Sequence, residues 1–501
     1  MCGIVGVLGN HEVAPILVEA LKRLEYRGYD SAGIATVNAG KLARRRAVGK
    51  LANLSDKLVH EPLAGKSGIG HTRWATHGAP TESNAHPHKS GRVAVVHNGI
   101  IENFRELRTE LAEAGISFQT ETDTETVALL TEHHIVQGCD PVEAAYKTLN
   151  RLQGAFALAF LFDGQDDLIV AARKGSPLAI GHGDGEMFVG SDAIALAPLT
   201  DRITYLEEGD RAVVTRQGVE IRDAQGTLAN RQVRQIQIDA ARVDKAGHKH
   251  FMAKEIAEQP TVLSNTLANY LGADGHIALP DPGIDFSSID RLTMVACGTA
   301  YYACLTAKYW FEQIARLPGE VDVASEFRYR EPPIPGRTLA LFVSQSGETA
   351  DTLAALRYCE GKADKIVSVI NVPESSIARE SDLALPIHAG VEVGVASTKA
   401  FTCQLTVLLM LALKAARERG TLSEAEYADH VSALRGVPAL TNLAIEQSGA
   451  MKSTARKLAE ARDILFLGRG IMYPLAHEGA LKLKEISYIH AEAYASGELK
   501  H

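Results

Sequence analysis

The first part of the chain carries short apolar runs separated by glycine turns. The runs at 92–97 and 155–162 predict β-strands. A helix is predicted to begin near Glu12, because apolar residues then recur at helical spacing, at Val13, Leu17, Ala20, Leu21 and Leu24. We therefore expect residues 1–238 to form an α+β domain.

The pattern changes further along the chain. A polar stretch followed by a helical pattern over 251–270 predicts a linker and helical segment at 239–285. From 286 to 450, apolar strands alternate with glycine turns and amphipathic helices, which predicts a parallel α/β sheet flanked by helices. Residues 451–501 hold one more such unit and are expected to be the incomplete front part of a second, similar domain, since one strand cannot bury its own apolar face.

Composition and charge exclude several classes of protein. The 501 residues are 46% hydrophobic and 23% charged, unlike a disordered chain or a fibre. A net charge of −9 argues against a surface for nucleic acid or an anionic membrane. The six cysteines form no CxxC pair, so reduced thiols in a cytoplasmic protein are expected. The apolar run at 405–416 is shorter than the roughly 20 residues that cross a bilayer, and it predicts a buried core helix.

Cys2 combines two chemical groups that catalysis can use. Removal of the initiator Met1 leaves a thiol and a free α-amine on this one residue. The amine has a reference pKa of roughly 7.7–8.0 and can take the thiol proton near neutral pH, so the residue is its own nucleophile and base. A buried cysteine at the start of a strand is the alternative interpretation.

Four motifs favour the nucleophile. They are MCGIVG at the start, EYRGYDSAG at 25–33, HTRWATHGAPTESNAHPH at 71–88 and VVHNGIIEN at 95–103. In combination they resemble the class II glutamine amidotransferases. The resemblance implies an N-terminal-nucleophile domain, an αββα sandwich, in which Cys2 attacks the carboxamide of L-glutamine and releases ammonia.

That attack requires hydrogen-bond donors for the oxyanion that develops on the carboxamide. The candidates are the Asn98 side-chain amide and the Gly99 backbone N–H, in a turn expected after the strand Val93–His97. A plain Asn-Gly hairpin turn is the alternative interpretation.

L-glutamine also carries a charged group at each end of its backbone. A planar Arg fork suits the α-carboxylate, and a carboxylate suits the α-ammonium group. Arg73 and Asp123 match the residues that do this in the family, together with Trp74, Thr76 and His77. Taken alone, Asp123 is better explained as a helix start, because Thr122 and Glu125 have capping-box spacing.

The four histidines of the longest motif, at 71, 77, 86 and 88, raise the question of a metal. Their spacing is not that of a zinc finger, so no metal is expected. No sequence motif indicates ATP, NAD or a flavin, and no cofactor is expected.

The second half offers a site for phosphate. SQSGET, at 344–349, lies between an apolar strand and a helical run, where hydroxyl groups and backbone N–H groups can hold an anion. The alternative is a turn in which Ser346 only caps the helix. ACGTA at 296–300 and VASTKAFT at 395–402 place similar residues in other turns, as ligand sites of open α/β sheets require.

These three turns together resemble the sugar isomerase (SIS) domains. The resemblance implies that these turns hold a sugar phosphate, with backbone contacts from Gly298 and Val395. The side chains that would contact it are those of Thr299, Ser344, Gln345, Ser346, Thr349 and Ser397. It also implies that Glu485 moves a proton between C1 and C2 of the sugar, with Lys482 and Glu478 nearby. His501 matches a histidine that assists ring opening in the neighbouring subunit, which implies a homodimer.

Both resemblances together imply an enzyme that converts D-fructose 6-phosphate and L-glutamine to D-glucosamine 6-phosphate and L-glutamate, the first step of hexosamine synthesis. Two departures from the family are visible: Ala300 replaces a usual serine, and no residue here matches the lysine of the family's C-terminal tail. If the chain is the entire molecule, we expect glutamine hydrolysis without aminosugar synthesis. A glutaminase-only hydrolase and a non-catalytic sugar-phosphate-binding protein are the alternatives.

Overall fold

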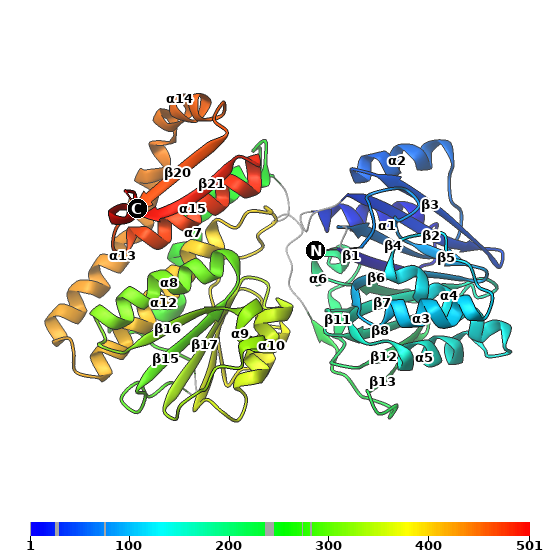
Figure 1. Cartoon of the computed structure of the whole chain (residues 1–501), viewed down its shortest axis with the longest axis horizontal. Coiled ribbons are helices and arrows are strands. Elements are labelled where there is room, and N and C mark those ends of the chain that lie inside the picture. Colours follow the sequence, from blue (N-terminus) through cyan, green and yellow to red (C-terminus); the bar gives the residue numbers. More distant parts are fainter. Residues whose placement is uncertain are drawn as a thin grey trace. The chain divides into compact units, whose positions relative to one another are not determined.

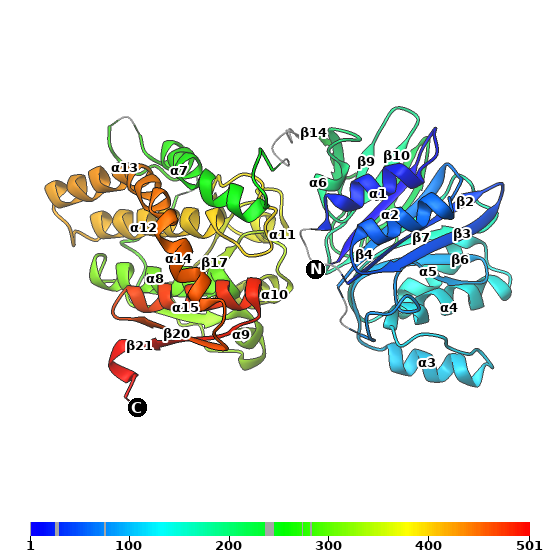
Figure 2. The same cartoon turned by 90° about the horizontal axis from the view of Figure 1, so that it is seen from above.

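The chain forms two compact units, Met1–Asp244 and Lys245–His501. The computed structural model describes residues 2–25, 30–74, 77–235, 245–272, 274–280 and 283–500. Figures 1 and 2 show the helices and strands of each unit.

Two antiparallel sheets form the centre of the first unit. The larger sheet has eight strands, in the order β14 (Arg234–Gln235), β11 (Arg202–Tyr205), β9 (Ala179–His182), β10 (Met187–Gly190), β1 (Gly3–Leu8), β4 (Ser67–Arg73), β2 (Ser31–Asn38) and β3 (Lys41–Val48). The smaller has six, in the order β13 (Gly218–Arg222), β12 (Arg211–Thr215), β8 (Ile169–Lys174), β7 (Gly154–Phe162), β6 (Val93–Ile101) and β5 (His88–Ser90).

Helices cover the outer face of each sheet. The larger sheet carries α1 (Ala14–Lys22), α2 (Leu51–His60) and α6 (Ala193–Leu196). The smaller sheet carries α3 (Phe104–Glu113), α4 (Asp123–Val136) and α5 (Pro141–Arg151) (Figure 1). The order of the layers is therefore helix, sheet, sheet, helix.

The alternation of side chains along each strand explains these layers. In β1, Ile4 and Leu8 lie in the core between the two sheets, whereas Val5 and Val7 lie under α1. Successive residues of a strand point to opposite faces, so a strand that is apolar at every position needs a cover on both sides. The αββα fold expected for this half is confirmed.

The second unit is built on a parallel sheet. Its strands lie in the order β16 (Gly319–Val323), β15 (Arg291–Ala296), β17 (Thr338–Ser344), β18 (Lys365–Ile370) and β19 (Leu383–Pro386). One face packs against α7 (Phe251–Tyr270), α8 (Gly298–Gln313) and α12 (Lys399–Glu418). The other packs against α9 (Ala324–Arg330), α10 (Ala350–Cys359) and α11 (Ser376–Glu380). The predicted α/β sheet flanked by helices is confirmed.

By length and composition α12 could cross a membrane. However, 78% of its most apolar stretch is buried inside the unit. This confirms the core helix expected at 405–416.

The chain continues beyond α12 with α13 (Glu424–Glu446), α14 (Ser448–Leu458), β20 (Asp463–Gly468), α15 (Met472–Ser487), β21 (His490–Ala495) and the 3-10 turn Ser496–Glu498. β20 and β21 pair in parallel, and α15 connects them and lies against α8. The expected boundaries at 238, 285 and 450, and the interpretation of 451–501 as the start of a second domain, stay predictions.

Candidate active sites

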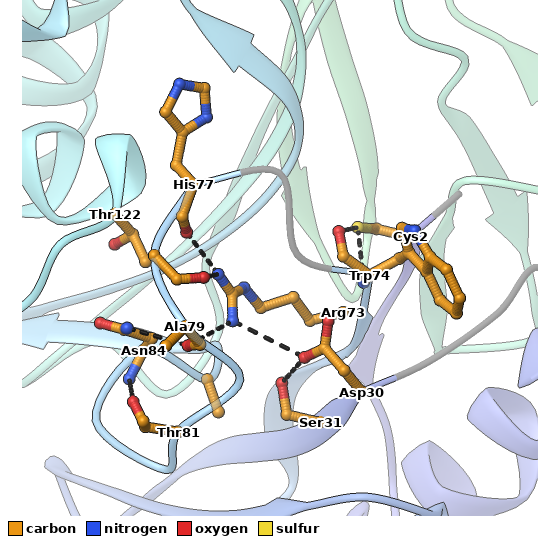
Figure 3. A network of polar contacts seen from close by, with 12 residues as sticks. Cys2, Asp30, Ser31, Arg73, Trp74, His77, Ala79, Thr81, Asn84 and Thr122 are labelled. Carbon is orange, nitrogen blue, oxygen red and sulfur yellow. Dashed lines mark hydrogen bonds and ion pairs between the residues drawn. The ribbon is translucent and has the colours of Figure 1, made fainter.

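Cys2 lies directly before β1, next to the end of β4. Gly3 of β1 pairs with Thr72 of β4, and this register brings Cys2 beside Trp74. The Trp74 backbone N–H donates to the Cys2 sulfur at 3.2 Å (Figure 3). Burial raises the pKa of the Cys2 thiol, although the Trp74 backbone contact opposes the increase. The thiol is therefore protonated near pH 7 and requires a base before it can act as a nucleophile.

Asn98 and Gly99 lie within a strand, so the turn expected after His97 is wrong. β6 continues to Ile101 because β7 pairs with it along its whole length, with Gly99 opposite Phe156. The Asn98 Nδ2 donates to the Cys2 carbonyl oxygen at 3.1 Å. Gly99 has φ +120°, and a Cβ atom there would lie 2.0 Å from the Ala155 carbonyl oxygen. Only glycine fits this point of the strand.

Arg73, the last residue of β4, is 4% exposed and holds the segment that follows it. Its guanidinium donates to the carbonyl oxygens of His77 at 2.5 Å, Gly78 at 3.1 Å and Ala79 at 3.4 Å. The Asp30 carboxylate lies 3.6 Å from it (Figure 3). Asp30 lies in the motif at 25–33 but is not among the predicted site residues, because its contact with Arg73 arises only when β2 and β4 pair.

Asp123 is the first residue of α4, and the capping interpretation of this segment is confirmed. The Thr122 side chain accepts from the Glu125 N–H. The Asp123 carboxylate also accepts from the Ile101 N–H at 2.9 Å and lies 3.8 Å from His97 Nδ1. The helix start therefore fixes a buried carboxylate at the end of the strand that carries Asn98.

The remaining residues expected around glutamine are partly described. The His77 ring packs on the edge of Phe104, with 5.4 Å between ring centroids. Thr76 lies outside the described residues. In the described ranges, no group of three His, Cys, Asp or Glu side chains is arranged to hold a metal ion.

In the second unit, the carboxyl ends of the parallel strands meet at one edge of the sheet. Ala296 of β15 pairs with Val343 of β17, and Ser344 pairs with Ile370 of β18. The turns that follow these strands therefore begin side by side. Gly298 opens α8 with φ +56°, and Ala300 belongs to the buried core.

The SQSGET turn is held by its own hydroxyl groups. Ser344 Oγ accepts from the Gly347 N–H at 3.0 Å and lies 3.0 Å from Thr349 Oγ1. Ser346 Oγ accepts from the Glu348 N–H at 3.2 Å. Helix α10 is capped at Thr349, so the interpretation of Ser346 as the helix cap is wrong. The Gln345 carbonyl accepts from the Asn371 N–H at 3.2 Å, which ties this turn to the next one.

Glu392 organises the third turn, a role that none of the sequence motifs indicates. This buried carboxylate accepts from the Thr398 N–H at 2.8 Å, the Ala400 N–H at 3.1 Å and Ser397 Oγ at 2.9 Å. It therefore occupies the N-terminus of α12 and orients the Ser397 hydroxyl. Val395, in the same turn, is 71% exposed.

Helix α15 brings two ionisable side chains, Glu478 and Lys482, to the first turn of α8. Thr299 Oγ1 donates to Glu478 at 3.1 Å and lies 2.9 Å from Lys482 Nζ. Lys482 also pairs with Glu485 at 2.7 Å. Burial raises the pKa of Glu478 to about 7, against the lowering effect of Lys482. His501 lies outside the described residues.

Comparisons with known proteins match both units. A family model described as a glutamine amidotransferase domain matches residues 71–198, and one described as a SIS domain matches 285–414 and 457–501. A glutamine–fructose-6-phosphate aminotransferase (isomerizing) of Brucella abortus is 60% identical over all of this chain and 83% of its own length. The chain belongs to the isomerizing glutamine–fructose-6-phosphate aminotransferase family.

Other members and one solved structure agree. The aminotransferase of Zymomonas mobilis is 57% identical, again over all of this chain and 83% of its own length. The C-terminal domain of the Francisella tularensis glucosamine-fructose-6-phosphate aminotransferase is 47% identical, with a TM-score of 0.50, and covers 52% of this chain and 73% of its own. The family explains why a thiol site and a sheet with hydroxyl-rich turns occur in one chain.

Proposed function

We propose that the protein is an aminotransferase that releases ammonia from L-glutamine and uses it to convert D-fructose 6-phosphate to D-glucosamine 6-phosphate, with L-glutamate as the second product. The observation that carries this proposal is the contact between the Asn98 amide and the Cys2 backbone, because it puts an oxyanion donor beside a nucleophilic sulfur. Family membership supports the acceptor sugar.

Glutamine hydrolysis begins when Cys2, with Met1 removed, attacks the carboxamide carbon of glutamine. The α-amine takes the thiol proton, because burial keeps the thiol protonated near neutral pH. Negative charge develops on the amide oxygen and is stabilised by Asn98 Nδ2 and the Gly99 N–H. The C–N bond breaks, ammonia leaves with the proton, and water then cleaves the thioester to give glutamate.

The charged ends of glutamine are assigned to Arg73 for the α-carboxylate and Asp123 for the α-ammonium group. The positions of both residues support this, since Arg73 ends β4 beside Trp74, and Asp123 meets the end of β6. Trp74, Thr76 and His77 complete the pocket in this proposal.

The phosphate of the sugar is assigned to the three turns at the carboxyl edge of the parallel sheet. Their hydroxyl and amide groups come from Thr299, Ser344, Gln345, Ser346, Thr349 and Ser397, with backbone contacts from Gly298 and Val395. The hydrogen bonds around Ser344 support the assignment, because they fix hydroxyl groups at the N-terminus of a helix.

Isomerisation of the sugar is assigned to α15. Glu485 moves the proton between C1 and C2, and its 2.7 Å contact with Lys482 supports this role because it fixes the position of the carboxylate. Glu478 and Lys482 lie beside Thr299, where they contact the bound sugar. We also propose a homodimer in which His501 of one subunit assists ring opening in the other. A cytoplasmic location accords with the free thiols of all six cysteines.

The test measures both products of the purified protein. Glutamate and glucosamine 6-phosphate are quantified by mass spectrometry after incubation with L-glutamine, with and without D-fructose 6-phosphate. The proposal predicts both products in similar amounts, and aminosugar made by the 501-residue chain would overturn the expectation that this chain alone only hydrolyses glutamine. Cys2→Ala should give neither product, and Ser344→Ala should lose sugar binding. Glutamate release that is unaffected by the sugar, without aminosugar, would identify a glutaminase instead. No release of glutamate at all would refute the proposal.

A further inference from the structure

The Asn98 amide has two ends that cannot be exchanged without changing the chemistry of the site. Its Nδ2 donates to the Cys2 carbonyl oxygen at 3.1 Å, and its Oδ1 lies 3.0 Å from Nε2 of His71. An oxyanion beside Cys2 is stabilised by the N–H group of Asn98 and repelled by its oxygen. The orientation of this amide therefore decides whether the site lowers or raises the barrier.

Two groups fix that orientation, the Cys2 carbonyl oxygen at the Nδ2 end and the ring of His71 at the Oδ1 end, and His71 does so through a single hydrogen. This residue lies in β4 and is fully buried, and its Nε2 also lies 2.9 Å from the His97 carbonyl oxygen. A carbonyl oxygen can only accept, so Nε2 carries the proton and the Asn98 atom that faces it is the acceptor Oδ1. Burial lowers the pKa of His71 to about 3, so the ring stays neutral near pH 7.

A cluster of buried histidine rings packs against His71. The His71 and His86 ring centroids are 4.1 Å apart, and those of His86 and His88 are 4.8 Å apart. His88 Nε2 lies 3.0 Å from Thr122 Oγ1, at the cap of α4. Burial lowers the pKa values of His86 and His88 well below the usual range, so the neighbouring rings do not repel one another as cations. The ring of His71 therefore has little freedom to turn.

We propose that His71 is a positioning residue for glutamine hydrolysis, which holds the Asn98 amide so that Nδ2 faces the reacting oxygen. This inference rests on the proposed role of Asn98. His71 itself touches neither glutamine nor the sulfur, and its effect passes entirely through the amide of its neighbour. The buried histidine cluster of the longest motif then has a catalytic purpose that requires no metal.

The first test removes the N–H donor of His71 and measures glutamate release. Loss of an oxyanion donor costs about 100- to 1,000-fold in kcat, and a misoriented donor should cost less. For His71→Leu we expect kcat to fall about 10- to 100-fold, with KM changed less than about threefold, because the donor acts on the transition state. His71→Gln retains an N–H group and should recover most of the lost rate. Equal losses in the Leu and Gln variants would overturn the inference.

A double-mutant cycle separates positioning from a general effect on folding. If His71 acts through Asn98, adding His71→Leu to Asn98→Ala lowers kcat by no more than about twofold. A double variant whose loss of kcat equals the product of the two single losses would contradict this. His182→Leu is the control, since this histidine of β9 lies in the same unit but bonds to Thr204 Oγ1 instead of Asn98. Its kcat should remain within about threefold of the wild type. If His71→Leu does not fold, His71→Met serves as the variant without a donor.

Alkylation of Cys2 by iodoacetamide gives an independent measurement. Displacement of iodide by the sulfur forms no oxyanion, so the alkylation rate should be the same within about twofold in the wild type and in His71→Leu. An alkylation rate that falls as far as the glutaminase rate would show that His71 acts on the nucleophile, against the inference. A wild-type protein that releases no glutamate would overturn the proposed function, and with it the role of His71. If the wild type is active and the losses of His71→Leu and Asn98→Ala multiply in the double variant, only the inference about His71 is overturned.

Discussion

The stability of the second unit should depend on pH through one carboxyl group, that of Glu478. This side chain lies on α15 with 6% of its surface exposed, and it contacts Thr299 and Lys482. Burial raises its pKa from 4.5 to about 7. The cause is the loss of hydration of the charged form, which Lys482 offsets only in part.

The direction of the effect follows from counting protons in the two states. Below about pH 4.5, Glu478 is protonated in both the folded and the unfolded chain. Between about 4.5 and 7 the unfolded chain has lost this proton and the folded chain has kept it, so rising pH favours unfolding. Above about pH 7 both are ionised, and the folded state carries the full cost. At about 1.4 kcal/mol for each pKa unit, that cost is about 3 kcal/mol.

The substitution Glu478→Gln removes the ionisation and keeps an oxygen that can accept from Thr299. We compare the free energy of unfolding of the second unit in the wild type with that in this variant. The wild-type value should fall relative to the variant by about 2.5 kcal/mol between about pH 5 and pH 8. Other titrating groups are common to both proteins and cancel in the difference. Glu485→Gln is the matched control, since it removes the other carboxylate that contacts Lys482.

Tryptophan fluorescence in urea can follow this transition. The chain has two tryptophans, Trp74 in the first unit and Trp310 in α8 of the second. A Trp74→Phe background leaves Trp310 as the reporter of the second unit, and urea adds no charge that would screen the ion pairs. If the difference between wild type and Glu478→Gln is the same at both pH values, the carboxyl does not ionise in this window and the reasoning fails.

Three further predictions concern the first unit. Gly99→Ala should lower the free energy of unfolding by about 3 kcal/mol or more in thermal or urea unfolding, because its Cβ would lie 2.0 Å from a carbonyl oxygen. The control is Gly138→Ala, which has φ +100° but open space around it and should lose less stability. Equal losses in the two variants would contradict a steric cause. The kcat/KM for glutamine should rise with pH and reach half of its maximum at about pH 7.7–8.0, the pKa range of an α-amine, since burial raises the pKa of the Cys2 thiol above 9.0. A half-maximum at the pKa of the thiol would exclude the amine as the base. Arg73→Lys should raise KM for glutamine at least about tenfold in steady-state assays, because a lysine cannot replace the planar fork; an unchanged KM would remove Arg73 from the glutamine site.

Local pattern alone was enough to predict several elements correctly. The helix expected over 251–270 is α7, and the helix expected near Glu12 is α1, which begins at Ala14. Both rest on periodicities of a few residues, which reflect which side of an element is buried. The alternation of apolar strands with glycine turns and amphipathic helices over 286–450 was enough to predict a parallel sheet flanked by helices.

Contacts between distant residues were not predictable in this way. Asn98-Gly99 has the local signal of a hairpin turn, yet β7 pairs through it and keeps it extended. The contacts of Arg73 with Asp30, and of Glu478 with Thr299, join residues 43 and 179 positions apart. The local propensities of these residues do not predict such contacts.

The sequence by itself thus determined the two fold classes and the kinds of chemical group that surround Cys2, because burial periodicity and chemical type are properties of single residues and their near neighbours. Only the tertiary structure decided the direction of the Asn98 amide, the protonation of Glu478 and the role of Glu392 at the start of α12. Each of these depends on loss of water and on a partner from another element, and both arise only when the elements pack together.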